Sequence, residues 1–438
     1  MKKKTVVLLI GLLFNSAATR AADLLDVYRD ARTQDPVFAS ARHAYEANKE
    51  VLPQVQAAYL PAISLSGVYS RNHRATEDTP TFDYNSSSYT LSISQPLFRL
   101  QSWIAVDQAA LQVRQAEAVL ADAGQNLIVR TAQVYFDVLL AQDNVALSAS
   151  QKTAINEQLA QAKRNFEVGT ATITDTYEAQ AKYDLAAAKE ISDLNDLEIK
   201  KRALQQLIGK LPARLAPLRN DPKLALPLPA DMEQWVKAAE EASPAIAQLR
   251  AVYEIATKEI DRSKAGHYPT LDLTGSYVNS SSPVLTASGA SPSLTTRAGT
   301  LGLSLNIPLY TGGGAQSKVR QALSNKSKAE QDLENIKRTV AQSVRQSFLG
   351  VTNGVAQVKA LEAALVSNKS SLDSTLLGKE VGVRTNVDVL NAQQQLFQAQ
   401  RDLQQARYNT ILSQLRLKAA AGRLVEEDLA EVNHMLDK

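Results

Sequence analysis

The sequence predicts an α+β membrane protein in which a β-barrel, shared between several copies of the chain, continues into long α-helices. Three observations support this prediction. Two halves of the chain repeat one order of elements, each half contains two stretches of alternating apolar and polar residues, and two very long segments lack proline. Composition agrees, because 5% aromatic residues among 438 is typical of long helices rather than of several compact globular domains.

Composition also excludes several classes of protein. The chain has no cysteine, which excludes a disulfide scaffold, a thiolate metal site, an iron–sulfur cluster and a cysteine nucleophile. The formal net charge is only +3, from 48 basic and 45 acidic residues. Such a small charge gives no basic stripe able to displace counterions from a nucleic acid, so we expect no nucleic-acid partner.

The N-terminus reads as a secretory signal peptide. Lysines at positions 2–4 precede the apolar run 5–14, and small residues follow, which predicts a signal peptide over residues 1–22 with cleavage somewhere within 18–22. The apolar run is shorter than the ~20 residues that a membrane-spanning helix needs. The mature chain is therefore expected outside the cytoplasm, and any membrane contact must be made by strands.

The chain is internally duplicated. Gly169 and Gly382 lie 213 positions apart, as do Asp175 and Asp388. Between the halves, closely spaced prolines exclude a regular helix or a central strand. The expected organisation after the signal peptide is a first repeat over residues 23–210, a proline-rich linker over 211–230, a second repeat over 231–423 and a C-terminal tail over 424–438.

Each repeat contains two predicted strands of about ten residues. In the first, Ile63 and Leu65 share one face while Ser64 and Ser66 take the other. The same alternation recurs at residues 89–94, 271–277 and 301–307. The long polar connections 71–88 and 279–298 are expected to be surface loops.

The helical segments are unusually long. No proline occurs between Pro96 and Pro212 or after Pro308, and a helix over residues 101–166 would be ~100 Å long, with 315–377 comparable. Apolar residues follow two heptad series along the first of these helices, which implies a neighbour on each side. This pattern favours a ring of helices, and a simple antiparallel bundle is the alternative.

Four strands cannot close a membrane barrel, because the smallest known barrels use about eight. Copies of the chain must therefore share one, with eight strands from two copies, twelve from three or sixteen from four. Strands of this length span ~25 Å of lipid and have one apolar face. Aromatic residues near the strand ends are candidates for interfacial girdles, although tyrosine favours strands anyway; they are Tyr59, Tyr69, Tyr89, Phe98, Tyr268, Tyr277 and Tyr310.

The duplicated layout, together with four short motifs, resembles the TolC family of outer-membrane efflux and type I secretion channel proteins. The motifs are the strand ends Gln95–Phe98 and Ile307–Tyr310 and the turns Val168–Thr170 and Val381–Val383. The resemblance covers essentially the whole mature chain. It implies a homotrimer in the outer membrane, with a twelve-stranded barrel that continues into a helical tunnel crossing the periplasm. It also implies a role as exit duct, with a periplasmic adaptor, an inner-membrane pump of the RND or ABC type and outer-membrane lipid as partners.

The segment after Gly382 contains the candidate pore constriction. Asp388 and Asn391 are three residues apart, so they share one face of a helix, and in a trimer they would form rings around the axis. The resemblance assigns these positions to the family's constriction, where charge rings select ions. The family often has a second aspartate where this chain has Asn391, so we expect a weaker cation preference.

A gate latch is predicted from the same resemblance. Arg384 matches a family residue that ties this turn to the turn of the first repeat, where Thr174 and Asp175 are the candidate partners. The alternative is a solvated arginine near a helix start. Gly169 and Gly382 are expected to end the long helices at hairpin turns, at the periplasmic tip of the tunnel.

No motif supports catalysis or a cofactor. The glycine run 312–314 lacks the lysine and hydroxyl residue of a nucleotide-binding loop, and the four histidines are scattered without a metal-binding spacing. We therefore expect neither enzyme activity nor a metal site. A secreted trimeric coiled-coil adhesin or scaffold without channel activity is the alternative function. The sequence does not indicate the pump, the adaptor or the cargo, which could be drugs, metal ions or a secreted polypeptide.

Overall fold

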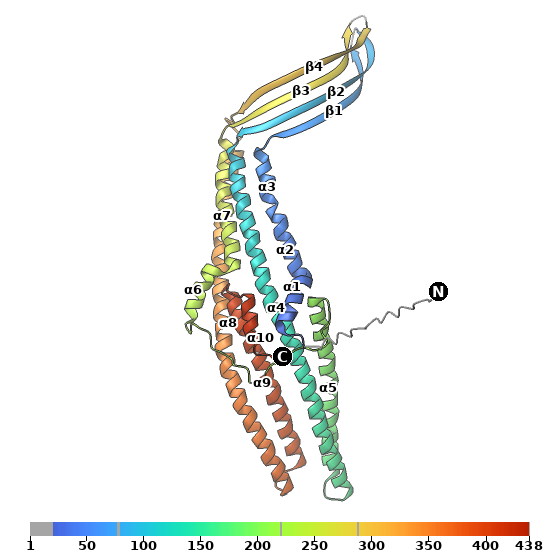
Figure 1. Ribbon diagram of the computed structural model, residues 1–438, viewed down its shortest axis with the longest axis vertical. Coiled ribbons are helices and arrows are strands. Elements are labelled where there is room, and N and C mark those ends of the chain that lie inside the picture. The colour runs from blue at the N-terminus through green and yellow to red at the C-terminus, as the bar shows by residue number, and fades with distance from the viewer. Residues whose placement is uncertain (1–20, 77–78, 220, 287–288, 438) are drawn as a thin grey trace, which may run out of the picture. The chain divides into compact units, whose positions relative to one another are not determined.

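The computed structural model describes residues 21–76, 79–219, 221–286 and 289–437 (Figure 1). The predicted signal peptide over residues 1–22 therefore lies almost wholly outside the described residues. The elements in order are α1 (Leu24–Gln34), α2 (Pro36–Lys49), α3 (Val51–Gln56), η1 (Ala57–Tyr59), β1 (Ala62–Thr76), β2 (Thr79–Phe98), α4 (Leu100–Glu167), α5 (Ile173–Ile208), α6 (Met232–Ala242), α7 (Pro244–Lys264), η2 (Ala265–His267), β3 (Thr270–Thr286), β4 (Gly289–Asn306), α8 (Gly314–Glu380), α9 (Asn386–Ala420) and α10 (Glu426–Asn433).

The two long helices are α4, with 68 residues, and α8, with 67 residues. They confirm the helices expected from the proline-free segments. None of the helices in the described ranges is both long and apolar enough to cross a membrane. Residues 211–231 contain only isolated β-bridges in their described part, at Leu215 and Leu218.

The chain forms two compact units, and each unit draws on both halves of the sequence. One unit comprises the described residues within 1–40, 123–243 and 340–438, and the other comprises those within 41–122 and 244–339. The first unit therefore contains the helical hairpins α4–α5 and α8–α9 from residues 123 and 340 onward. The second contains the sheet and the starts of α4 and α8.

The first unit has an apolar core where α1, α4, α5, α9 and α10 meet. Tyr135 and Leu127 on α4 are fully buried there, with Ile411 and Leu415 of α9. The hydroxyl of Tyr135 donates to the carbonyl of Ala216 at 2.7 Å, which ties the segment after α5 to the core. This core fixes the bases of both hairpins.

The second unit contains one antiparallel sheet in the order β1-β2-β3-β4 (Figure 1). The strands have 15, 20, 17 and 18 residues, so the expectation of about ten was wrong. Most of segments 71–88 and 279–298, expected to be loops, is strand. Cross-strand hydrogen bonding holds these polar extensions without apolar burial. For example, Asn72 Nδ2 donates to Ser86 Oγ at 2.8 Å.

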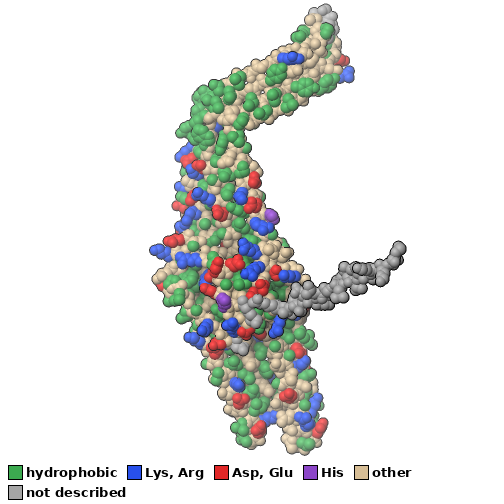
Figure 2. All heavy atoms as spheres, in the orientation of Figure 1, with side chains coloured by type: hydrophobic (Ala, Val, Ile, Leu, Met, Phe, Trp, Pro, Cys, Tyr) green, Lys and Arg blue, Asp and Glu red, His purple; other side chains and the backbone are tan. Residues whose placement is uncertain are grey.

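One face of the sheet is apolar and exposed in a single copy of the chain. Leu301 is 77% exposed and Leu65 is 75% exposed, and their neighbours in the sequence are small or polar. Figure 2 shows the visible side of the sheet as mainly hydrophobic and uncharged side chains, whereas charged side chains are frequent over the helices. An exposed apolar face of this size marks a contact surface for a membrane or another protein, and a single copy of the chain does not bury it.

Candidate functional site

The tips of the two helical hairpins lie at tight turns that contain glycine. Gly169 connects α4 to α5 with φ of 76°, and Gly382 connects α8 to α9 with φ of 81°. Residues with a side chain rarely adopt this left-handed conformation, so glycine suits both positions. Both tips belong to the first unit.

A capping box begins the helix after each turn. Thr172 accepts from the Asp175 backbone N–H, and the Asp175 carboxylate accepts from the Thr172 backbone N–H at 3.0 Å. Thr385 and Asp388 repeat this arrangement, with the Asp388 carboxylate 2.9 Å from the Thr385 nitrogen. These reciprocal bonds hold each aspartate in a fixed position at a helix start.

Asp388 is held in its charged form. Hydrogen bonds from the backbone N–H and then the hydroxyl of Thr385 lower the pKa of the Asp388 carboxyl, and the nearby Arg384 charge acts in the same direction. Asn391 lies one turn further along α9 and is exposed. Asp388 and Asn391 therefore share one face of the helix, as their spacing predicted.

Arg384 does not reach the first turn within one copy of the chain. Throughout the described residues, neither a hydrogen bond nor an ion pair joins Arg384 to Thr174 or Asp175. Arg384 instead lies over Gly378, where an added Cβ would come within 2.7 Å of its Cγ. Thr174 is exposed in the first turn of α5. A latch between Arg384 and these residues across copies stays a prediction.

Lys379, which sequence reasoning missed, connects the two hairpins. Its ammonium donates to Gln158 Oε1 and Gln161 Oε1 of α4, both at 2.9 Å, and to Asn386 Oδ1 of α9 at 2.8 Å. Burial lowers the pKa of Lys379. A possible signal in the sequence is that no acidic residue stands three or four positions from Lys379, so its partners had to come from elsewhere in the fold.

Apolar packing joins the same hairpins. Leu390 of α9 is 2% exposed and packs in a cluster with Ile155 and Leu159 of α4 and Ala179 of α5. Further along the hairpins, Arg401 of α9 lies 3.7 Å from the carboxylate of Asp193 on α5. Within one copy the two hairpins are therefore held together at several levels.

The predicted girdle aromatics fall into two rows on the sheet. One row lies where the sheet meets the helices, and the other lies seven to nine residues along the strands. In the second row the ring of Tyr89 covers Gly67 of β1, where an added Cβ would lie 3.3 Å from the ring. The first row is Tyr59, Phe98, Tyr268 and Tyr310, and the second is Tyr69, Tyr89 and Tyr277.

The described residues contain no cluster of three or more histidine, aspartate or glutamate side chains placed to hold a metal ion. The hairpin tips offer fixed carboxylates, the partly buried ammonium of Lys379 and exposed polar groups.

Comparisons with known proteins agree with this architecture. The outer membrane efflux protein family matches residues 27–210 and 235–423. The outer membrane protein TolC of Vibrio cholerae is 34% identical over 95% of this chain and 94% of its own length. The alkaline protease secretion protein AprF of Pseudomonas aeruginosa is 32% identical over 93% of this chain and 86% of its own. The crystal structure of the outer membrane protein VceC from Vibrio cholerae superposes with a TM-score of 0.76 at 19% identity, covering 91% of this chain and 96% of that one.

The match extends over both halves of the chain and both hairpins, and the family consists of transport channels rather than enzymes. Its members work as trimers in the outer membrane, with periplasmic adaptors and inner-membrane pumps. Four strands from each of three copies close one barrel, which continues into a helical tunnel in the periplasm. The chain therefore belongs to the outer membrane efflux protein family and is the exit duct of an efflux or type I secretion assembly.

Proposed function

We propose that this chain is a passive conduit, without catalytic activity, whose periplasmic end narrows at the hairpin tips to a ring of Asp388 side chains. The observation that carries the proposal is the capping box, which fixes Asp388 as a carboxylate at the start of α9. Three copies around one axis bring three such charges to one level. A charge ring at a narrow point selects ions because little water remains to screen it.

Asn391 forms a second, neutral ring on the same face of α9. A ring of amides adds hydrogen-bonding groups but no net charge. The cation preference of this constriction is therefore set by Asp388 alone. Neutralising Asp388 in each copy then removes the cation preference of the constriction.

The closed state is held by contacts between the hairpins. Within one copy Lys379 and Leu390 fix the α8–α9 hairpin against the α4–α5 hairpin. Between copies, the proposed latch pairs Arg384 with Thr174 or Asp175 of a neighbour. Opening by an adaptor must therefore break contacts within and between copies.

The two rows of aromatic residues mark the membrane band of the barrel. Seven to nine residues of a tilted strand rise roughly 18–23 Å, close to the ~25 Å height of an outer-membrane apolar band. The polar strand segments beyond the second row then extend outside the membrane. This accounts for strands longer than the bilayer requires.

The order of elements also supports a duplication, with repeats over residues 23–210 and 231–423 joined by the linker 211–230 and followed by the tail 424–438. Each repeat supplies two strands, one long helix and one hairpin tip. The pump, of the RND or ABC type, supplies the energy and selects the cargo. The name of AprF refers to protease secretion, and an exported polypeptide is accordingly one candidate cargo.

The experiment is single-channel recording in a planar bilayer with a trivalent cation, La³⁺, added on the periplasmic side. We expect La³⁺ to block the wild-type channel and to lose its effect in Asp388→Asn. Asp373→Asn, an exposed acidic residue on α8, is the matched control and keeps the block. Equal block in Asp388→Asn and wild type would show that Asp388 does not form the constriction.

A further inference from the structure

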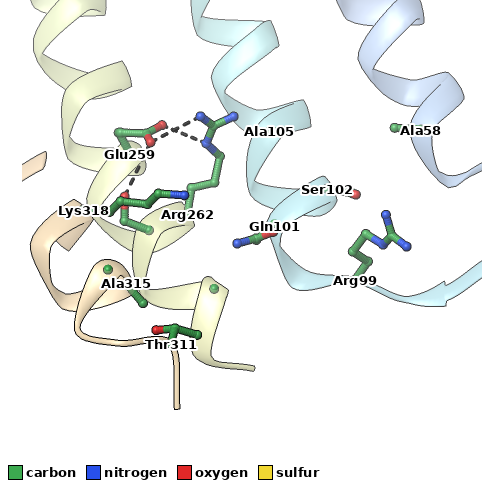
Figure 3. A pocket seen from close by; sticks show the side chains of 13 residues that line it. Ala58, Arg99, Gln101, Ser102, Ala105, Glu259, Arg262, Thr311, Ala315 and Lys318 are labelled. Atoms are coloured by element: carbon green, nitrogen blue, oxygen red, sulfur yellow. Dashed lines mark hydrogen bonds and ion pairs between the residues drawn. The ribbon is translucent and has the colours of Figure 1, made fainter. Parts of the chain in front are cut away.

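A cavity of about 660 Å³ lies in the second unit, where the strands of the sheet meet the helices. Its lining comes from four places in the chain, which are η1, the start of α4 with the residue before it, the end of α7 with η2, and the start of α8 with the segment before it (Figure 3). Its volume lies within the ~300–1,000 Å³ of sites for small organic molecules. Neither the constriction nor the girdles account for it.

The charged side chains that line this cavity are mostly cationic. Arg99, Arg262 and Lys318 line it together with a single acidic residue, Glu259. Glu259 is paired with Arg262, with 2.8 Å between Oε2 and Nε, as the dashed lines in Figure 3 show. Arg99 is paired with Asp272 of β3 at 2.9 Å. The ammonium of Lys318 forms neither a hydrogen bond nor an ion pair with any described residue.

In Figure 3 the side chain of Lys318 lies on the same side of the cavity as the Arg262–Glu259 pair. Arg262 and Arg99 are each balanced by a carboxylate, so Lys318 leaves one unbalanced positive charge in the lining, which an anion can neutralise. Further donors are available around the same space. The Nε of Arg99 is buried and lacks a hydrogen-bond partner among the described residues. The hydroxyls of Ser102 and Thr311 also line the cavity.

The cavity lies on the polar side of the sheet. Asp272, the partner of Arg99, alternates along β3 with Leu271 and Leu273, so it belongs to the face opposite the apolar one. In a barrel with lipid outside, that face lines the water-filled interior. Dissolved molecules in the passage can therefore reach Arg99 and its neighbours.

We propose that this cavity binds oxyanionic groups, carboxylate or phosphate, of solutes that pass from the tunnel into the barrel. Charge-assisted hydrogen bonds from guanidinium and ammonium groups to such oxygens are short and strong. Three copies of the chain carry three of these sites at one level of the passage. This inference rests on the proposed conduit only in that the passage delivers the anion.

The test measures block of the channel by inorganic pyrophosphate in bilayers of phosphatidylcholine, which has no net charge. Lys318→Gln removes the unpaired cation, and we expect about tenfold weaker block, because one charge-assisted hydrogen bond is lost. Lys318→Arg should retain the block. Arg320→Gln is the matched control, because it removes one positive charge two residues away, outside the cavity lining. Pyrophosphate should block this variant as strongly as wild type.

Isothermal titration of the detergent-solubilised trimer with pyrophosphate gives a second readout that does not require conduction. Equal block and equal binding in Lys318→Gln and wild type would overturn the oxyanion site, while a conducting wild type would leave the conduit intact.

Discussion

The ammonium of Lys379 donates to Gln158 Oε1 at 2.9 Å, and this contact joins the tip of the α8–α9 hairpin to α4. Gln161 and Asn386 accept the other two hydrogen bonds. All three acceptors are neutral amides. The tether is therefore a set of charge-assisted hydrogen bonds rather than an ion pair, and we expect it to be less sensitive to salt than the predicted Arg384 latch.

Lys379→Met should loosen the closed tip. The substitution keeps an unbranched apolar stem and removes all three hydrogen bonds, and the loss of hydrogen bonds to a charged group costs about 2 kcal/mol in this half-buried setting. We expect a higher mean conductance in planar bilayers. Lys369→Met on the same helix, where the side chain is exposed, should leave the conductance unchanged. A closed-like conductance in Lys379→Met would exclude the tether.

Arg384→Ser tests the latch between copies separately. If Arg384 reaches Thr174 or Asp175 of a neighbour, its loss should raise the conductance. High salt screens an exposed ion pair, so it should shift the wild-type channel toward the same more open behaviour as Arg384→Ser. Wild-type gating in Arg384→Ser would favour a solvated arginine.

The charge of Asp388 should persist to unusually low pH. Hydrogen bonds from Thr385 lower the pKa of the Asp388 carboxyl in the folded protein. The carboxylate therefore stabilises the fold at pH values above the pKa of Asp388 in the unfolded chain. This stabilisation is lost as the pH falls through the lower pKa of the folded state. In Thr385→Val the hydroxyl is lost, the pKa rises, and block by La³⁺ should disappear at a higher pH than in wild type. Thr172→Val alters the equivalent capping box around Asp175 and is the matched control. An unchanged pH dependence in Thr385→Val would contradict this account.

Gly422→Ala should destabilise the first unit far more than Gly169→Ala. Both glycines have positive φ, 70° and 76°. An added Cβ at Gly422 would lie 2.4 Å from the carbonyl oxygen of Ala242, whereas nothing lies within 4 Å at Gly169. Gly169→Ala therefore costs only the backbone strain of about 1 kcal/mol. Thermal unfolding compares the two variants. Equal unfolding midpoints would show that the backbone at Ala242 can move away from a side chain at position 422.

Leu390→Ala should weaken the packing between the hairpins. Leu390 is 2% exposed in the cluster with Ile155 and Leu159, and removing such a side chain costs about 2–5 kcal/mol. We expect faster hydrogen exchange in the first turns of α9, with little change near Leu415 in the core of the unit. Unchanged exchange at the tip would mean that the cluster does not hold the hairpins together.

The long helices could be predicted from the sequence because their signal is long and simple. No proline interrupts α4 or α8, and a run of more than sixty helical positions is difficult to mistake. The strands were predicted only where apolar and polar residues alternate. Their outer parts, such as Asn72 beside Ser86, are held by hydrogen bonds between polar residues and have no apolar face to detect.

The candidate site divides in the same way. The position of Asp388 on the segment after Gly382 followed from the sequence, whereas the capping box with Thr385, although its signature is local, was not identified there. The partners of Lys379 lie 221 and 218 positions away, at Gln158 and Gln161, and only the packing of the hairpins brings them together. The cations of the oxyanion cavity likewise come from three separate places, the residue before α4, α7 and α8, and no local motif links them.

The channel requires several copies of the chain to share one barrel around a water-filled passage. Single-channel recording of the purified full-length protein in a planar bilayer tests this most directly. We predict stable conducting events whose single-channel conductance does not change with protein concentration, because the complete trimer is the conducting unit. A protein that inserts as a single copy and stays electrically silent would contradict the account.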